Sequence, residues 1–256
     1  MENKFVKTGF TEFDKELYGL EKGHVILLAG RPSMGKSAFA ISLIDNICQR
    51  NEGGCIYFTA DNELQVPRLC DRLATAHMWN IVADEKFGDD QTNRRKAFMD
   101  IDKYNLVLLD AYFDNIELRI QWFMDEIEKN PVKIIVIDGL QKLCTNASGW
   151  LDRRKMHTEL ARFKGLAKEK NCPILVTSDL KRTVEKRKDH HPEICDIYGL
   201  SDPLSLVDDI ILLYRDDYYD NMSKKPDIAE IFHISTRSKR VTNIEFGFSH
   251  KYARFL

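Results

Sequence analysis

The sequence has no cysteine pair at metal-ligand spacing, no apolar run of membrane length and no large excess of either charge. Its six cysteines are scattered without a CxxC pair, which excludes the common zinc modules and favours reduced thiols. The longest apolar run, around residues 134–137, falls far short of the ~18 residues of a membrane span, and no secretory signal opens the chain. Lys and Arg number 38 against 40 Asp and Glu, so a net charge of −2 excludes a uniformly basic coat for nucleic acid. We therefore expect a cytoplasmic protein without a membrane segment.

What the sequence does have is a regular alternation of short apolar runs and longer amphipathic stretches. Continuous Val, Ile and Leu in the runs is typical of a sheet covered by helices on both faces, and the alternation favours parallel pairing. Little helix separates the last runs, so we expect these to extend the sheet as antiparallel or edge strands. The expected strands are 24–29, 54–58, 106–109, 132–137, 173–176, 209–214 and 229–235, and the expected helices are 37–49, 64–77, 116–129 and 154–170.

No Pro/Gly/Ser-rich linker, internal repeat or low-complexity tract divides the 256 residues. A chain of this length fits one large α/β domain or two small ones. The uninterrupted rhythm of strands and helices therefore predicts a single α/β domain, residues 1–256, with a mainly parallel twisted sheet and helices on both faces.

The strongest motif is GRPSMGKS at residues 30–37, which matches GxxxxGK[ST]. An expected buried strand enters it and an expected helix leaves it, as a phosphate-binding loop requires. Its glycines let backbone N–H groups face phosphate oxygens, and the helix N-terminus adds partial positive charge. Lys36 is the residue that reaches the β- and γ-phosphates, and the Ser37 hydroxyl is the expected Mg²⁺ ligand. The pattern predicts binding of a nucleoside triphosphate, with candidate contacts at Gly30, Arg31, Pro32, Ser33, Met34, Gly35, Lys36, Ser37 and Ala38.

A second acidic group that orients magnesium is expected at the end of a neighbouring buried strand. Asp138 fits this position because four apolar residues, 134–137, precede it. Taken alone, Asp138 fits equally well as a cap of the following turn. Beside the phosphate-binding loop, we interpret it as the partner of Ser37 in holding Mg²⁺.

Several ordered motifs make the sequence resemble the motor domain of the DnaB-type replicative DNA helicases. The stretch RPSMGKSAFA at 31–40 resembles their P-loop, and TGFTEFD at 8–14 resembles their entry to the domain. IDGLQ at 137–141 resembles their Walker B strand with the Leu-Gln that follows, and YRD at 214–216 resembles a late segment of the family. The resemblance covers the chain from about residue 6 onward and implies a RecA-like P-loop NTPase fold.

The resemblance also implies an activity. These helicases hydrolyse ATP with Mg²⁺ and translocate on or unwind DNA in replication. They do so as hexameric rings of identical subunits around single-stranded DNA. A replication partner protein is a further expectation. The family usually carries an N-terminal helical domain, whereas this sequence begins at the motor. Two alternatives stay open: a nucleotide-binding interaction or regulatory protein with weak or lost motor activity, and a RecA relative of the recombinase or clock-protein type.

Departures at catalytic positions favour the interaction-protein alternative. The presumed catalytic base of the family is a Glu after the second strand, where this sequence has Asp61, with Glu63 two residues further on. The shorter side chain displaces the carboxylate by roughly 1.5 Å, a change that can cost about 10²-fold in rate. A Gln that senses the γ-phosphate in the family is replaced by Asp179, which would repel phosphate unless a cation lies beside it.

Arg237 is the candidate arginine finger. In the family a Lys-x-Arg pair reaches into the ATP site of the neighbouring subunit, and here the same place reads STR at 235–237. The arginine is kept and the lysine is lost, with Lys239 and Arg240 as possible substitutes in a loop that bends differently. The alternative is a solvated charge ahead of the last strand.

Candidate DNA contacts follow the expected strand at 173–176. Tyr198 stands where the family carries an arginine that holds single-stranded phosphates, so it offers stacking but no charge. A basic run, Lys181-Arg182 and Lys186-Arg187-Lys188, lies upstream of Tyr198. Six copies of this run in a ring would concentrate positive charge around single-stranded DNA. A solvated loop without a DNA role is the alternative. The candidates are Lys181, Arg182, Arg187, Lys188 and Tyr198.

Overall fold

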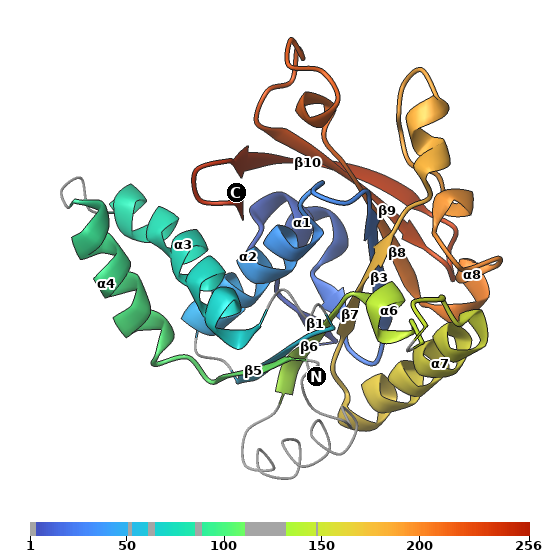
Figure 1. Ribbon diagram of the computed structural model, residues 1–256. Helices are drawn as coiled ribbons and strands as arrows, with labels where there is room; N and C mark the ends of the chain where they lie inside the picture. The colour runs from blue at the N-terminus through green and yellow to red at the C-terminus, as the bar shows by residue number, and fades with distance from the viewer. Residues whose placement is uncertain (1–3, 51–52, 61–64, 85–88, 111–131, 147) are drawn as a thin grey trace.

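The computed structural model describes residues 4–50, 53–60, 65–84, 89–110, 132–146 and 148–256 (Figure 1). Within these residues one large sheet is built from β3 (Val25–Gly30), β4 (Gly54–Thr59), β5 (Leu106–Asp110), β6 (Val132–Asp138), β7 (Ile174–Asp179), β8 (Asp209–Tyr214), β9 (Ile228–Ser235), β10 (Val241–Ser249) and β11 (Arg254–Phe255). Their order across the sheet is β11-β10-β9-β8-β3-β7-β6-β4-β5. The strands expected from the sequence are all present, and β10 and β11 are additional.

The sheet is parallel over most of its width. Strands β8, β3, β7, β6, β4 and β5 run in parallel, whereas β9, β10 and β11 pair antiparallel at one edge. The expected α/β class and the antiparallel extension by the last strands are both confirmed. Because parallel strands share one carboxyl edge, the loops after β3, β6 and β7 meet at the same place, where ligands bind in open α/β sheets.

Helices cover both faces of the sheet (Figure 1). The residues of β3 alternate between two cores, one on each face of the sheet: Ile26 and Leu28 belong to one, and Leu27 and Ala29 belong to the other. This explains the continuous apolar runs, because both faces of the central parallel strands, such as β3, β4 and β8, are buried. The helices are α1 (Thr11–Leu17), α2 (Lys36–Gln49), α3 (Val66–Asp84), α4 (Asp90–Ile101), α6 (Leu140–Leu143), α7 (Arg153–Lys170) and α8 (Pro203–Leu206).

The described residues also contain shorter elements. Strand β1 (Phe5–Val6) pairs with β2 (Leu20–Glu21), and 3-10 turns are found at η1 (Arg182–Lys186), η2 (Ile194–Asp196) and η3 (Asp216–Tyr218). The helix expected at 116–129 lies outside the described residues. Across the described part of the chain, no helix has the length and apolar character needed to cross a membrane.

The C-terminal strand β11 holds the helix that follows the P-loop. Arg254 is almost fully buried and pairs through Nη1 with Asp45 of α2, which is itself fully buried. His77 of α3 bonds the same carboxylate at 2.8 Å, and the Phe255 amide donates to Ser42 Oγ at 3.1 Å. Burial raises the pKa of Asp45, but the His77 hydrogen bond and the Arg254 charge outweigh it and hold that pKa below its usual value.

Candidate active site

The phosphate-binding loop connects β3 to α2 at the carboxyl edge of the sheet. Gly35 is the N-terminal cap of α2 with φ 112°, a conformation that an L-residue adopts only under strain. A Cβ on Gly35 would also lie 3.2 Å from the ring of Phe255. The Met34 amide donates to the Arg31 carbonyl at 3.1 Å, and the Met34 side chain is buried beneath the turn. The loop therefore keeps its shape through its own backbone and the core below it.

A cavity of about 710 Å³ opens above this loop. Asp138 at the end of β6 and Asp179 at the end of β7 line it from the sheet, and Asp71 and Arg72 line it from α3. The structure thus brings together the two parts of the predicted magnesium site, Ser37 and Asp138. The predicted residues that line the cavity are Pro32, Ser33, Gly35, Lys36, Ser37, Ala38 and Asp138.

Arg31 uses its side chain away from this cavity. Its Nε and Nη2 atoms donate to Glu185 Oε1 at 3.0 and 2.7 Å, and Nη1 donates to the Leu180 carbonyl at 2.7 Å. The predicted contact of Arg31 with phosphate can therefore involve its backbone, while the guanidinium ties the P-loop to η1. Gly30 and Met34 are buried and do not line the cavity.

Asp138 is held by two hydroxyl groups. Tyr57 of β4 donates to Oδ2 and Thr177 of β7 donates to Oδ1, each at 2.6 Å. Burial and the nearby Asp138 carboxylate raise the pKa of Tyr57 well above its usual value, so that the phenol keeps its proton and donates. These bonds fix the carboxylate in one orientation, and its remaining acceptor capacity suits a hard cation such as Mg²⁺.

Lys36 meets a carboxylate in the cavity. Its Nζ atom lies 2.9 Å from Asp179 Oδ1 and also donates to the carbonyls of Gly30 and Arg31, at 3.0 and 3.2 Å. The sequence predicted that Asp179 would repel phosphate unless a cation lies beside it, and the structure places Lys36 of the P-loop there.

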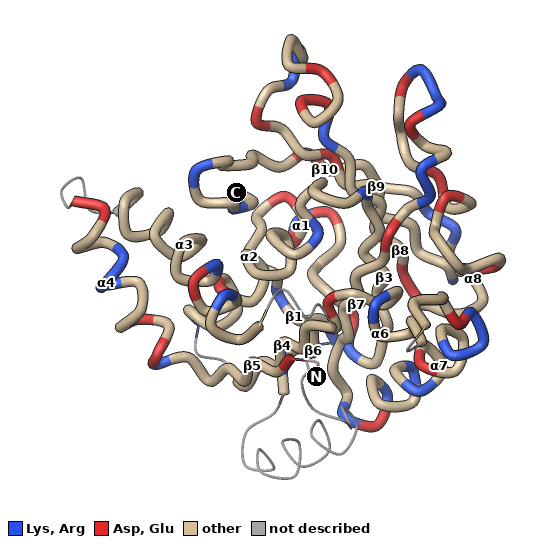
Figure 2. The backbone as a smooth tube through the Cα atoms, viewed as in Figure 1, with Lys and Arg blue, Asp and Glu red and all other residues tan. Residues whose placement is uncertain are grey.

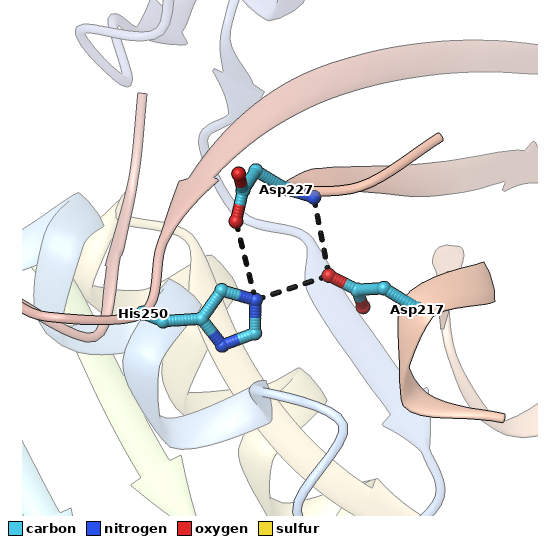
Figure 3. A group of neighbouring side chains, drawn as sticks. All are labelled: Asp217, Asp227 and His250. Atoms are coloured by element: carbon cyan, nitrogen blue, oxygen red, sulfur yellow. Dashed lines mark hydrogen bonds and ion pairs between the residues drawn. The ribbon is translucent and has the colours of Figure 1, made fainter. Parts of the chain in front are cut away.

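Arg215 also lines the cavity, on the side of β10. Its guanidinium lies 4.2 Å from the centre of the Phe248 ring, and its Nε donates to Asp217 Oδ1 at 3.0 Å. Figure 3 shows how the other oxygen of Asp217 is held, by His250 at 3.0 Å and by the Asp227 amide at 3.2 Å. Burial raises the pKa of Asp217, but the hydrogen bonds from His250 and Arg215 bring it below its usual value. This cluster holds the guanidinium of Arg215 against Phe248, which also lines the cavity.

Arg237 lies at the opposite edge of the sheet. It is exposed in the turn between β9 and β10. Ser235 at the end of β9 pairs with Asp209, and Asp209 pairs with Ile26 near the amino end of β3. The P-loop follows the carboxyl end of β3, whose six residues span about 17 Å at ~3.3 Å per residue. The structure therefore does not bring Arg237 to the P-loop of its own chain.

The predicted DNA segment projects from the sheet after β7 and carries both signs of charge (Figure 2), with five Lys or Arg and four Asp or Glu between residues 181 and 196. Arg187 pairs with Glu193 at 2.8 Å and with Asp196, and Lys181 Nζ donates to a backbone carbonyl at 2.7 Å. These two predicted contacts are thus engaged within the segment, whereas Arg182 and Lys188 are exposed.

Tyr198 lies next to the cavity-lining strand β7. Its side chain is 43% exposed, and its amide donates to the Asp179 carbonyl at 2.9 Å. The buried side chain of Gln141 bridges the two residues: its Oε1 accepts from the Asp179 amide at 3.0 Å, and its Nε2 donates to the Tyr198 carbonyl at 2.9 Å. The predicted DNA contact and the cavity therefore share one hydrogen-bonded connection.

The two candidate bases, Asp61 and Glu63, lie outside the described residues. Sequence reasoning missed Tyr57, Thr177 and Arg215 as parts of the site. A tyrosine within the otherwise apolar strand β4 was the available signal for the first. The arginine of the Tyr-Arg-Asp segment carries a family resemblance, but the resemblance alone does not place it at the cavity.

A phosphate-binding loop after a central parallel strand, with an acidic residue ending a nearby strand, defines a P-loop NTPase fold. The family model for the DnaB-like helicase C-terminal domain matches residues 6–256, and the chain belongs to this family.

Known relatives agree with this assignment. The replicative DNA helicases DnaB of Geobacillus stearothermophilus and Haemophilus influenzae are 27% and 28% identical to it over 98% of the chain. The chain spans about half the length of these relatives, 56% and 54%.

Solved structures resemble the protein throughout. A structure of a DnaB-like replicative helicase and its interactions with primase superposes with a TM-score of 0.85 at 26% identity, covering 100% of this chain and 64% of that one. A second solved structure, described as an ATPase domain, superposes with a TM-score of 0.82 at 27% identity, covering 99% and 91%. A KaiC-like protein of Pyrococcus horikoshii, at 16% identity and a TM-score of 0.64, covers 98% and 97% and shares the fold.

Proposed function

We propose that the chain is a single ATPase domain that drives a DNA helicase in replication, acting in the cytoplasm as a hexameric ring on single-stranded DNA. The observation that carries the proposal is the convergence of Lys36, Ser37 and Asp138 on one cavity, in a chain that belongs to the DnaB-like family. A replication partner protein fits the same proposal, since the matched helicase structure was described with primase.

The residues of the cavity have the chemistry that ATP and Mg²⁺ require. The loop amides and Lys36 would bind the phosphates, and Ser37 with Asp138 would hold Mg²⁺. Bound there, Mg²⁺ supplies positive charge that offsets the charge of the transferring phosphate. Tyr57 and Thr177 keep Asp138 oriented for this role. We assign Asp61 or Glu63 the task of orienting the attacking water.

A complete site in this proposal needs a second subunit. Arg237 lies at the amino edge of the sheet, away from the P-loop of its own chain. In a head-to-tail ring, each such edge can face the P-loop of a neighbour. Arg237 would then stabilise charge on the phosphate in trans, an effect that is worth 10³–10⁵ in rate in other P-loop enzymes.

The second candidate is a nucleotide-binding regulatory protein with little motor activity. It is favoured by the internal pairing of Arg187 and by the mixed charge of the segment at 181–196, whose four carboxylates offset most of its five positive charges.

The test is ATP hydrolysis measured with and without single-stranded DNA over a range of protein concentrations. Lys36→Ala is the blank, and Lys168→Ala, at an exposed lysine on α7, is the matched control. We expect turnover that rises with DNA and with concentration, and that Lys36→Ala abolishes. Nucleotide binding without DNA-stimulated turnover would favour the regulatory protein, and turnover by Lys36→Ala at the wild-type rate would contradict the site.

A further inference from the structure

Lys36 has no spare hydrogen-bond donor among the described residues around it. A lysine ammonium group carries three N–H donors. They are matched by the Asp179 carboxylate at 2.9 Å and by the carbonyls of Gly30 and Arg31 at 3.0 and 3.2 Å. To meet a phosphate, Lys36 must therefore exchange one of these partners. The carboxylate is the partner that carries charge, so a phosphate contends with Asp179 for the same cation.

Asp179 cannot withdraw far from the site. Its backbone amide donates to Gln141 Oε1 at 3.0 Å, and its carbonyl accepts from the Tyr198 amide at 2.9 Å. Its Cα also lies in register with Gly30 in the parallel pair of β7 with β3. Only the short side chain is free to turn. A carboxylate displaced from Lys36 thus remains at the edge of the same cavity.

The position of Asp179 singles out the third phosphate. A P-loop surrounds the α- and β-phosphates with backbone amides, while its lysine extends to the β- and γ-phosphates. The γ-phosphate therefore projects from the loop toward the neighbouring strand ends. Strand β7 lies between β3 and β6, so Asp179 stands between the P-loop and Asp138. The third phosphate adds negative charge beside two carboxylates, of which Asp138 is the one suited to Mg²⁺.

We propose that Asp179 is a specificity-determining residue that weakens the binding of nucleoside triphosphates relative to diphosphates. It does so by holding Lys36 and by leaving a negative charge beside the third phosphate. The inference rests on the proposed nucleotide site and adds a selectivity to it. In a motor, such a residue favours the diphosphate-bound site over the triphosphate-bound one.

The test compares affinities for ADP and for a non-hydrolysable ATP analogue, both with Mg²⁺, by isothermal titration calorimetry. Asp179→Asn removes the charge at nearly constant size, and Asp179→Ala is a second variant that removes the side chain. Asp102→Asn is the matched control, because Asp102 is an exposed carboxylate at the end of α4 and does not line the cavity. Circular dichroism checks the fold of each variant.

We expect both Asp179 variants to strengthen analogue binding relative to ADP by about tenfold, the effect of one like charge a few ångströms away at a partly exposed site. Asp102→Asn should change this ratio by less than about twofold, because its charge is exposed to solvent, screened and outside the cavity. An unchanged ratio in the Asp179 variants, or weaker analogue binding, would overturn the role of Asp179 and leave the nucleotide site intact. An equal change in Asp102→Asn would show a general charge effect and likewise overturn it. If the wild-type chain bound neither nucleotide, the proposed site itself would be refuted.

Discussion

The position of Arg237 makes a quantitative prediction about mixed assemblies. Lys36→Ala removes the proposed phosphate-binding lysine and Arg237→Ala removes the proposed finger, so each variant alone should lose ATP turnover. The two positions lie at opposite edges of the sheet, separated by the length of β3, about 17 Å at ~3.3 Å per residue. In the proposed ring, an active site would therefore take Lys36 from one subunit and Arg237 from the next.

Mixing the two inactive variants should restore activity. An intact site forms where an Arg237→Ala subunit supplies the P-loop and a Lys36→Ala subunit supplies the finger. At a one-to-one ratio and with random order, about a quarter of the sites meet this condition in a head-to-tail ring. The assay is steady-state ATP hydrolysis over a series of mixing ratios, after the subunits have exchanged. Recovery should be greatest at equal amounts and vanish at either extreme.

Two results would refute this reasoning. The first is no recovery at any ratio, while each variant still assembles and exchanges subunits. The second is an Arg237→Ala protein that retains full turnover when dilute. Arg154→Ala serves as the matched control, because Arg154 is an exposed arginine on α7. It should keep its activity alone and should fail to respond to mixing with the wild-type chain.

Two further predictions concern the buried group around Asp45. Arg254→Met should lower the free energy of unfolding by about 3–5 kcal/mol, because it leaves the Asp45 carboxylate buried without its cation. Urea denaturation measures this loss. The lowered pKa of Asp45 means that its stabilising contribution is present above the unfolded-state value of about 3.9 and is lost as the pH falls through the folded-state value. Asp45→Asn should accordingly be less stable at pH 7 and lose less of its remaining stability than the wild-type chain between pH 5 and 3.

A matched control variant separates the loss of the buried ion pair from the general effect of removing an arginine on the free energy of unfolding. Arg240→Met removes an exposed arginine that lies 4.0 Å from Glu16, and it should alter stability by no more than about 0.5 kcal/mol. A loss below about 1 kcal/mol in Arg254→Met would contradict the account of the buried pair, since removing one partner of such a pair is costly. Parallel stability curves for the wild-type chain and Asp45→Asn between pH 5 and 3 would contradict the assignment of the acid dependence.

Much of the parallel sheet was predictable, because buried strands carry continuous apolar runs. The segments of the fold that were missed lack that signal. In α4 only Asn93 and Ala97 are buried, so the helix shows no apolar periodicity. In β10 the buried residues Ile244, Phe246 and Phe248 alternate with more exposed ones, and this period of two is a weaker signal in a strand that also contains glycine.

The candidate site likewise has a part that the sequence predicts and a part that it does not. The P-loop residues are contiguous and follow a local motif, so the sequence alone located them. The pairing of Lys36 with Asp179 and of Arg31 with Glu185 joins residues more than 140 positions apart. No local pattern encodes such contacts. They depend on β7 lying beside β3, which is a property of the strand order.

The anchoring of α2 by β11 also has a consequence for the time course of synthesis. Arg254 and Asp45 are separated by 209 positions, so the helix that begins at the P-loop leaves the ribosome long before its buried cation exists. At about 5–20 residues per second, that interval lasts about 10–40 s. During it the Asp45 carboxylate has no Arg254 to pair with, so α2 reaches its full packing only after the residues of β11 have been translated.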